Sequence, residues 1–362
     1  MKIQEVFRTE VRSPGRRCSV FPGAVRLADR SILLWFVAGS DFESSDQHIE
    51  QARSCDGGKT WQWLGAVYDH ARLGLSVPFT DSAKPTQLDG NNLLAVGYGF
   101  VRDRPDMDLS GYAEKFGRFP ECRNFALHSS DGGRNWTMPQ WIEHPYSGME
   151  ISGPALKLRN GEVLFFASPF ALRPDDQKGL CFSGGETGRR WREVSVFFRR
   201  PGVAAWEVRG IQLASGRIVL ALWAYDLAHR KNLNNHLVWS DDNGRSWSVP
   251  FDTGLPGQAA NLAVYGDRLL LLQTRREGKD CGLYLSSFSF TGKDRLECSE
   301  TVPLMSSAQL ASADGRIEKQ FRSLKFGQPS LLALDDGSYL AVFWQAKDEN
   351  YMIQIRKIAI SA

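Results

Sequence analysis

The stretch SCDGGKTW at residues 54–61 decides the fold, because its pattern Ser-x-Asp-x-Gly-x-x-Trp recurs along the chain. Further copies are SSDGGRNW at 129–136 and SDDNGRSW at 240–247, and GGETGRRW at 184–191 is a degenerate copy. Short Ser and Asp side chains bond the backbone of a turn, Gly accepts positive φ, and Trp anchors the turn on an apolar layer. We therefore expect each copy to join two strands, with Asp56, Asp131 and Asp242 serving the fold rather than catalysis.

A second repeat is an apolar extended run, a short polar turn and another extended run. It occurs at 21–39, 84–99, 153–169, 208–225, 261–274 and 328–345. Each copy predicts a β-hairpin, so the six copies predict an all-β, six-bladed propeller. Only one more strand, 352–360, follows the last copy. We expect the N-terminal strand, 3–11, to pair with it and close the ring, which makes residues 1–362 a single domain.

Composition excludes several classes of function. The 362 residues carry a net charge of +3, which predicts neither nucleic acid nor a membrane as partner. The six cysteines are scattered without a C-x-x-C pair, so no metal or other cofactor is expected. The N-terminal residues 1–17 contain no apolar core of the length that a signal peptide needs, and no stretch of about 18 apolar residues occurs in the sequence. A cytoplasmic protein is therefore the expectation.

The hairpin turns and the Ser-x-Asp turns must lie at one end of the blades, because antiparallel strands alternate in direction. The connections at the opposite end are long and polar, as binding loops on a rigid scaffold are. We predict the functional site there. Its expected substrate-binding residues are Arg17, Asp41, His48, Lys84, Arg209, Tyr225, Gln258, Asn261, Arg275 and Gln328. Arg276, which directly follows Arg275, could also bind an acidic sugar.

The three good turn repeats resemble the Asp-box (BNR) repeats of the sialidase, or neuraminidase, superfamily. That resemblance implies an acid/base role for Asp46 and the place of the sialidase Glu for Glu207. It puts Gln328 where sialidases have their tyrosine nucleophile and Val20-Phe21-Pro22 where they have Arg-Ile-Pro. The arginine triad and the nucleophile are thus missing, so the chain resembles a divergent member without sialidase activity.

The remaining acids favour a glycoside hydrolase with a non-sialic, acidic glycan as substrate. Such an enzyme needs one carboxyl group to protonate the leaving oxygen and another to attack or to activate water. We predict Asp46 and Glu207 as this pair, with Glu150 and Asp81 as further catalytic candidates. One alternative is a polysaccharide lyase with His48, His229 or Tyr225 as base. Another is a non-catalytic propeller that binds a glycan or a protein.

Overall fold

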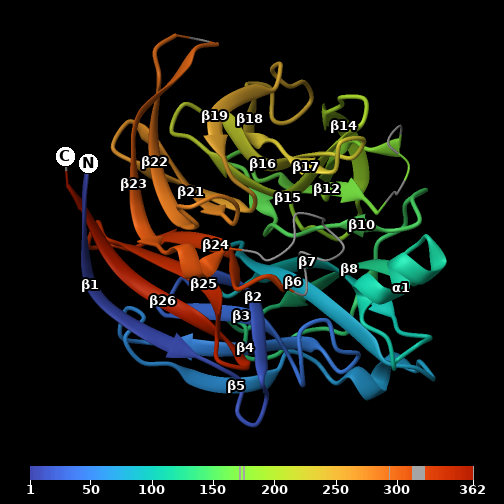
Figure 1. The fold of residues 1–362 in the computed structure, drawn as a ribbon. Coiled ribbons are helices and arrows are strands. Elements are labelled where there is room, and N and C mark those ends of the chain that lie inside the picture. The colour runs from blue at the N-terminus through green and yellow to red at the C-terminus, as the bar shows by residue number, and fades with distance from the viewer. Residues whose placement is uncertain (171–172, 174–175, 293, 312–322, 362) are drawn as a thin grey trace.

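The computed structural model describes residues 1–170, 173, 176–292, 294–311 and 323–361, and it is built almost entirely of strands (Figure 1). It includes the α-helix α1 (Leu109–Phe116) and the 3-10 helices η1 (His70–Leu73) and η3 (Ala308–Leu310). None of the described helices is long and apolar enough to span a bilayer. The sequence also predicts long loops within the domain at 101–122 and 305–325. The first contains α1, and residues 312–322 of the second lie outside the described part.

The largest sheet has eight strands and consists of two antiparallel halves. Its order is β24 (Phe326–Ala333), β25 (Tyr339–Lys347), β26 (Asn350–Ser361), β2 (Cys18–Arg26), β3 (Ile32–Gly39), β4 (His48–Ser54) and β5 (Gln62–Ala66), with β1 (Lys2–Val11) also paired to β26. Among the described residues, the halves are paired into one sheet where Cys18 of β2 lies parallel to Tyr351 of β26. Because β1 and β26 are antiparallel, both chain ends lie together (Figure 1).

The other four sheets follow in chain order and are antiparallel. The first contains β6 (Phe79–Gln87), β7 (Leu93–Val101), β8 (Cys122–Ser129) and β9 (Gln140–Trp141), and the second β10 (Met149–Glu150), β11 (Leu156–Lys157), β12 (Val163–Pro169), β13 (Gly179–Ser183) and β14 (Arg192–Phe198). The third contains β15 (Val203–Gln212), β16 (Ile218–Asp226), β17 (Lys231–Asn232), β18 (Asn234–Ser240) and β19 (Phe251–Pro256), and the fourth β20 (Ala260–Tyr265), β21 (Arg268–Arg275), β22 (Gly282–Phe290) and β23 (Leu296–Ser306).

The innermost strands of these sheets pack against one another around a common centre. Strand β2 contacts β6 and β24, β24 contacts β20, and β20 contacts β15. Strand β15 contacts β11, which contacts β6 and so leads back to β2. Figure 1 shows the sheets arranged around this centre. Side chains from strands far apart in the sequence therefore meet there.

The strands next to the innermost ones are apolar on both faces. All eight residues of β3, ILLWFVAG, are buried. Leu34 and Phe36 pack in one cluster with residues of β25, whereas Leu33 and Trp35 pack on the opposite side with residues of β7. Because neighbouring sheets cover both faces, the strand is a continuous apolar run instead of an alternating one.

The Ser-x-Asp repeats form turns between strands, as their composition predicts. In the turn from β4 to β5, Ser54 Oγ accepts the N–H of Gly58 at 2.8 Å and Asp56 Oδ1 accepts that of Thr60 at 3.0 Å. The Trp61 indole N–H donates to the Gly58 carbonyl at 3.0 Å. The same serine and aspartate bonds recur at Ser129 and Asp131 and at Ser240 and Asp242. The carboxylates of Asp56, Asp131 and Asp242 therefore accept hydrogen bonds from the backbone of their own turns.

Candidate active site

Two glutamates, Glu207 on β15 and Glu150 on β10, meet near the common centre. The backbone N–H of Glu207 donates to Glu150 Oε2 at 3.2 Å, and the Ser152 hydroxyl donates to Glu150 Oε1. Gln328 of β24 donates its amide Nε2–H to Glu207 Oε1 at 2.5 Å. Glu207 Oε2 is buried and accepts no hydrogen bond from any residue that the structure describes. This oxygen is therefore open to a proton or to a ligand hydroxyl.

Three cationic side chains, Lys84, Arg209 and Arg276, surround the two carboxyl groups. Each of them is 2–4% exposed. Lys84 and Arg209 interact electrostatically with both glutamates, and Arg276 interacts with Glu207. We name these three residues, the two glutamates and Gln328 the central cluster. Its three cations outnumber its two acids, which favours an anionic ligand.

Burial sets the protonation of the central cluster. Burial, followed by the negative charge of Glu207, raises the pKa of Glu150 to about 7. Burial, followed by the positive charge of Arg209, lowers the pKa of Lys84 to about 7. The cluster thus contains a carboxyl group that keeps its proton almost to neutral pH and an amine that can lose one there. Acid–base catalysis requires groups of this kind.

Backbone bulges on the innermost strands direct two members of the central cluster. Glu207 has φ of 50° and lies in a bulge of β15, and Gln328 has φ of 42° and lies in a bulge of β24. Phe21, in the corresponding bulge of β2, has φ of 55°. Non-glycine residues seldom adopt this left-handed conformation, and it is concentrated at functional sites. The bulges thus aim two side chains from separate sheets at each other.

A small cavity lies beside Lys84 and Arg209. Its volume is about 20 Å³, enough for one water molecule. Asn261 and Ser330 also line it, and Asn261 Oδ1 accepts the backbone N–H of Leu331 at 3.3 Å. Asn261, predicted to bind substrate, therefore lines this water-sized cavity next to Lys84 and Arg209.

Asp46 has a different environment from the two glutamates. Its carboxylate accepts hydrogen bonds from Ser40 and Ser44 and forms an ion pair with Arg16. Partial burial acts to raise the pKa of Asp46, but the bonds from Ser44 and Ser40 outweigh it and hold that pKa below its usual value. Asp46 contacts no member of the central cluster among the described residues. Its described role is to fold the loop between β3 and β4.

Asp81 belongs to a second group of polar side chains. Its Oδ2 accepts the Tyr68 hydroxyl and lies 3.0 Å from His70 Nε2, while Oδ1 accepts the Ile49 N–H at 2.9 Å. The His70 ring lies 5.5 Å from that of His48. All of the Asp81 bonds are therefore made within this group. Among the described residues, no hydrogen bond or ion pair joins this group to the glutamate pair.

His48, predicted to bind substrate, is held by its own strand and loop. Its Nε2 lies 3.2 Å from Glu50 Oε1, and its Nδ1 lies 3.0 Å from the Asp46 carbonyl. Burial acts to lower the pKa of His48, but the hydrogen bond to Glu50 outweighs it and raises that pKa. Both ring nitrogens of His48 thus have partners within the protein.

Three other predicted binding residues have their contacts outside the central cluster. Arg17 pairs with Glu349 at 3.2 Å, with both side chains exposed. Asp41 accepts the N–H of Phe42 at 2.8 Å and is exposed as well. Arg275 lies over the Tyr284 ring at 4.3 Å. None of these three predicted residues contacts the central cluster in the described structure.

Tyr225 and Gln258 contact residues that belong to the central cluster or adjoin it. Tyr225 is 1% exposed and stacks on Trp206, the residue before Glu207, with ring centroids 4.9 Å apart. Gln258 Oε1 accepts the backbone N–H of Arg276 at 3.1 Å and so fixes the residue that approaches Glu207.

Six of the predicted residues come together in the central cluster: Glu150, Glu207, Lys84, Arg209, Gln328 and Arg276. Ser152 and Trp206, which contact members of the cluster or adjoin them, were not predicted. Ser152 follows Glu150 by two positions, and the period of two in extended chain puts such residues on the same face. That spacing was the available signal for Ser152. No comparable signal marks Trp206, because the bulge at Glu207 breaks the alternation of its strand.

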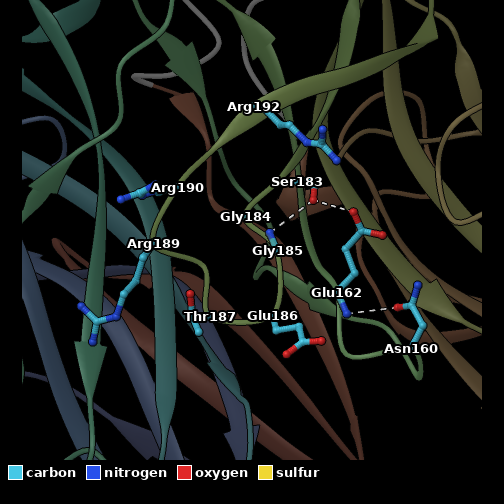
Figure 2. A pocket seen from close by; sticks show the side chains of 10 residues that line it. All are labelled: Asn160, Glu162, Ser183, Gly184, Gly185, Glu186, Thr187, Arg189, Arg190 and Arg192. Carbon is cyan, nitrogen blue, oxygen red and sulfur yellow. Dashed lines mark hydrogen bonds between the residues drawn. The ribbon is translucent and has the colours of Figure 1, made fainter.

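A wider, open pocket lies elsewhere, at the degenerate turn between β13 and β14. It measures about 650 Å³ and is lined by Asn160, Glu162, Ser183, Gly184, Gly185, Glu186, Thr187, Arg189, Arg190 and Arg192. Figure 2 shows that Arg189, Arg190 and Arg192 point in different directions, and Glu162 is bonded to Ser183 at 2.6 Å. Its charged groups do not converge, so its chemistry makes it a weaker candidate than the central cluster.

Known structures resemble this fold. A protein of unknown function from Dyadobacter fermentans DSM 18053 superposes with a TM-score of 0.77 and 16% identity over 99% of both chains. The NanB sialidase from Streptococcus pneumoniae gives 0.67 and 12%, over 99% of this chain and 70% of that one. Trypanosoma rangeli sialidase gives 0.65 and 12%, and the match covers 94% of this chain but 55% of the sialidase.

No family model and no curated protein matches the sequence. The likeness to solved structures therefore establishes the class of fold, a sialidase-like, all-β propeller. This chain spans about half the length of the trypanosomal sialidase. At these identities the likeness carries the architecture and no activity.

Proposed function

We propose that this protein is a glycoside hydrolase whose catalytic pair is Glu150 and Glu207. The observation that carries the proposal is the contact between these two residues inside a buried, positively charged cluster. Glu150, whose pKa is raised to about 7, is the general acid that protonates the leaving oxygen. It takes the role that the sequence suggested for Asp46, because the pKa of Asp46 is lowered.

Glu207 acts on the sugar carbon or on a water molecule. Its Oε2 has no hydrogen-bond partner among the described residues, while Gln328 holds its Oε1. Gln328 stands where the resemblance to sialidases would place a tyrosine nucleophile, and an amide cannot take that part. Glu207 itself is therefore the group that completes the reaction, as nucleophile or as base.

The substrate we propose is an acidic, non-sialic glycan. Arg276 and Arg209 lie beside Glu207 with their guanidinium groups buried. Guanidinium groups bind carboxylates through paired hydrogen bonds, and burial strengthens such contacts. A uronic acid carries its carboxylate on the sugar ring, so it can contact the arginines while its glycosidic bond faces the glutamates.

The proposal includes the finer description of the scaffold. The eight-stranded sheet divides into β24–β26 with β1 and into β2–β5, which gives six units together with the other four sheets. We propose that these units are six propeller blades in one domain, residues 1–362, closed by the pairing of β1 with β26. The Ser-x-Asp turns correspond in this scheme to the Asp boxes of sialidases.

The test is turnover of a panel of aryl glycosides, including uronides and sialosides, followed by release of the aryl group. We expect uronide hydrolysis in the wild type and a loss of about 100-fold or more in Glu150→Gln and Glu207→Gln. Asp46→Asn is the matched control and is expected to keep most of the activity. Hydrolysis that survives both glutamate substitutions would refute the assignment.

One observation favours a polysaccharide lyase as a second candidate. The pKa of Lys84 is lowered to about 7, first by burial and then by Arg209, so the amine can act as a base. Arg209 would neutralise the uronate carboxylate during proton removal. A lyase leaves an unsaturated product that absorbs in the ultraviolet, so the same assays, read by absorbance on oligouronides, separate the two reactions.

A further inference from the structure

An aromatic stack borders the central cluster. The half-buried Trp206 of β15 stacks on Tyr225 with an interplanar angle of 22°, and Trp223 meets it edge-on at 5.2 Å and 82°. Tyr225 and Trp223 are 1% and 3% exposed, so Trp206 is the outer member of the stack. Two aromatic neighbours fix the orientation of its indole ring.

The stack is continuous with the proposed catalytic pair. The Arg276 guanidinium lies 5.9 Å from the centre of the Trp223 ring and also interacts with Glu207. Trp206 directly precedes Glu207, and in the bulge that follows it is Val208 that packs into the apolar core. The stack therefore adjoins the central cluster in two ways, through Arg276 and through the peptide link between Trp206 and Glu207.

Two hydrogen bonds hold Trp223, the edge-on member of the stack. The Trp223 indole N–H donates to Asn232 Oδ1 at 2.7 Å, and the Asn232 amide donates to Glu277. These bonds join the segment after β16 to the segment after β21. The buried part of the stack is thus tied to two connections of the scaffold, which keeps its outer ring in place.

We propose that Trp206 forms the stacking surface for a second sugar ring, next to the ring whose bond is cleaved. This inference rests on the proposed function and narrows it, because the natural substrate would then be an oligosaccharide or polysaccharide. The apolar C–H face of a pyranose packs on an aromatic ring, and burying such a surface stabilises the complex. The catalytic pair and the two arginines bind one acidic ring, and Trp206 binds its neighbour.

The test compares two kinds of substrate in Trp206→Ala. A uronosyl fluoride contains a single sugar ring, which would bind at the catalytic pair. An oligouronide has further rings, one of which would stack on Trp206. We expect the loss of kcat/KM on the oligouronide to exceed the loss on the fluoride by about 10-fold or more. Trp206→Phe keeps an aromatic face and is expected to recover most of this difference.

Trp141→Ala is the matched control. Trp141 lies on β9, is 39% exposed and packs edge-on against Phe79 at 5.8 Å. Like Trp206, it is an accessible tryptophan that packs against another aromatic ring, but it lies outside the central cluster. We expect Trp141→Ala to change kcat/KM for both substrates by the same factor.

A second measurement is calorimetric titration of Glu207→Gln with oligouronides, with and without the additional substitution Trp206→Ala. This titration measures binding without turnover.

The outcomes separate the two proposals. Equal losses on both substrates in an active enzyme would overturn the stacking surface and leave the hydrolase proposal intact. Oligouronide binding that depends on Trp206, in a protein that hydrolyses nothing, would support the stacking surface and overturn the hydrolase. Binding that does not change in Trp206→Ala would overturn the inference in either case.

Discussion

Gln328 donates a hydrogen bond of 2.5 Å to Glu207 and so connects β24 to β15 across the common centre. Both residues have left-handed backbone in bulges of their strands. The contact orients one oxygen of Glu207 and leaves the other without a partner among the described residues. An active-site carboxylate that is positioned but still reactive requires this arrangement.

Removal of this bond is the first prediction. Gln328→Leu keeps a branched side chain but cannot donate, and a hydrogen bond to a charged group contributes about 1.5–3 kcal/mol. We expect kcat/KM per folded molecule to fall about 10- to 100-fold. The melting temperature should fall by several degrees as well, because the buried Glu207 carboxylate loses a hydrogen-bond partner. Steady-state kinetics and thermal unfolding check both. Unchanged kinetics would mean that Gln328 does not position Glu207.

The pH dependence of turnover is the second prediction. Because Glu150 must carry its proton and its pKa is raised to about 7, activity should fall as pH rises through about 7. Initial rates over a range of pH measure this alkaline limb. A rate that stays constant well above pH 7 would contradict the role of Glu150 as general acid.

Protonation of Glu150 should also make the free energy of unfolding depend on pH. Folding raises the pKa of Glu150 from 4.5 to about 7, so the unfolded chain loses its proton first as pH rises. The folded state binds more protons over this window, and the contribution of Glu150 to the free energy of unfolding falls from about pH 4.5 to pH 7. Glu150→Gln should remove that slope in urea unfolding.

Neighbouring arginines give the third prediction. Arg276 joins the central cluster, whereas Arg275 lies over the Tyr284 ring. We expect Arg276→Ala to raise KM for a uronide about 10- to 100-fold and Arg275→Ala to change it much less. A neutral aryl glycoside should show no such difference. An equal effect of both substitutions would contradict the proposed contact with the substrate carboxylate.

The fourth prediction concerns the turns. Asp56 accepts bonds from the N–H groups of Lys59 and Thr60 and from the Ser54 hydroxyl. Asp56→Ala should lower the free energy of unfolding by about 1–2 kcal/mol while turnover per folded molecule is retained. Chemical denaturation with a parallel activity assay measures both. A large loss of turnover without loss of stability would give Asp56 a catalytic role.

The turns and hairpins could be predicted from the sequence because their signals are local. The pattern around Ser54 contains its own bonding partners, and the apolar runs show period and length directly. The central cluster is a different case, since Glu150 and Glu207 are 57 residues apart and Gln328 lies 121 residues beyond Glu207. Their contact depends on bulges and on the order of the innermost strands, which residue type alone does not reveal.

Asp46 is a second case in which the sequence alone does not reveal the chemistry of a residue. Spacing before the first turn repeat made it the favoured acid, but the protonation of a carboxyl group depends on its surroundings. Ser40, Ser44 and Arg16 stabilise its charged form. Glu150 is buried beside another carboxylate, so its neutral form is favoured. Burial is a property of the folded chain, and therefore spacing in the sequence favours Asp46, whereas the mechanism proposed from the structure uses Glu150.

The most direct test of the central claim is hydrolysis of an aryl uronide by the wild type, Glu150→Gln, Glu207→Gln and Asp46→Asn, each shown to be folded by circular dichroism. The proposed mechanism predicts hydrolysis by the wild type and by Asp46→Asn, and a loss of about 100-fold or more in both glutamate variants. Activity lost in Asp46→Asn and retained in Glu150→Gln would contradict it.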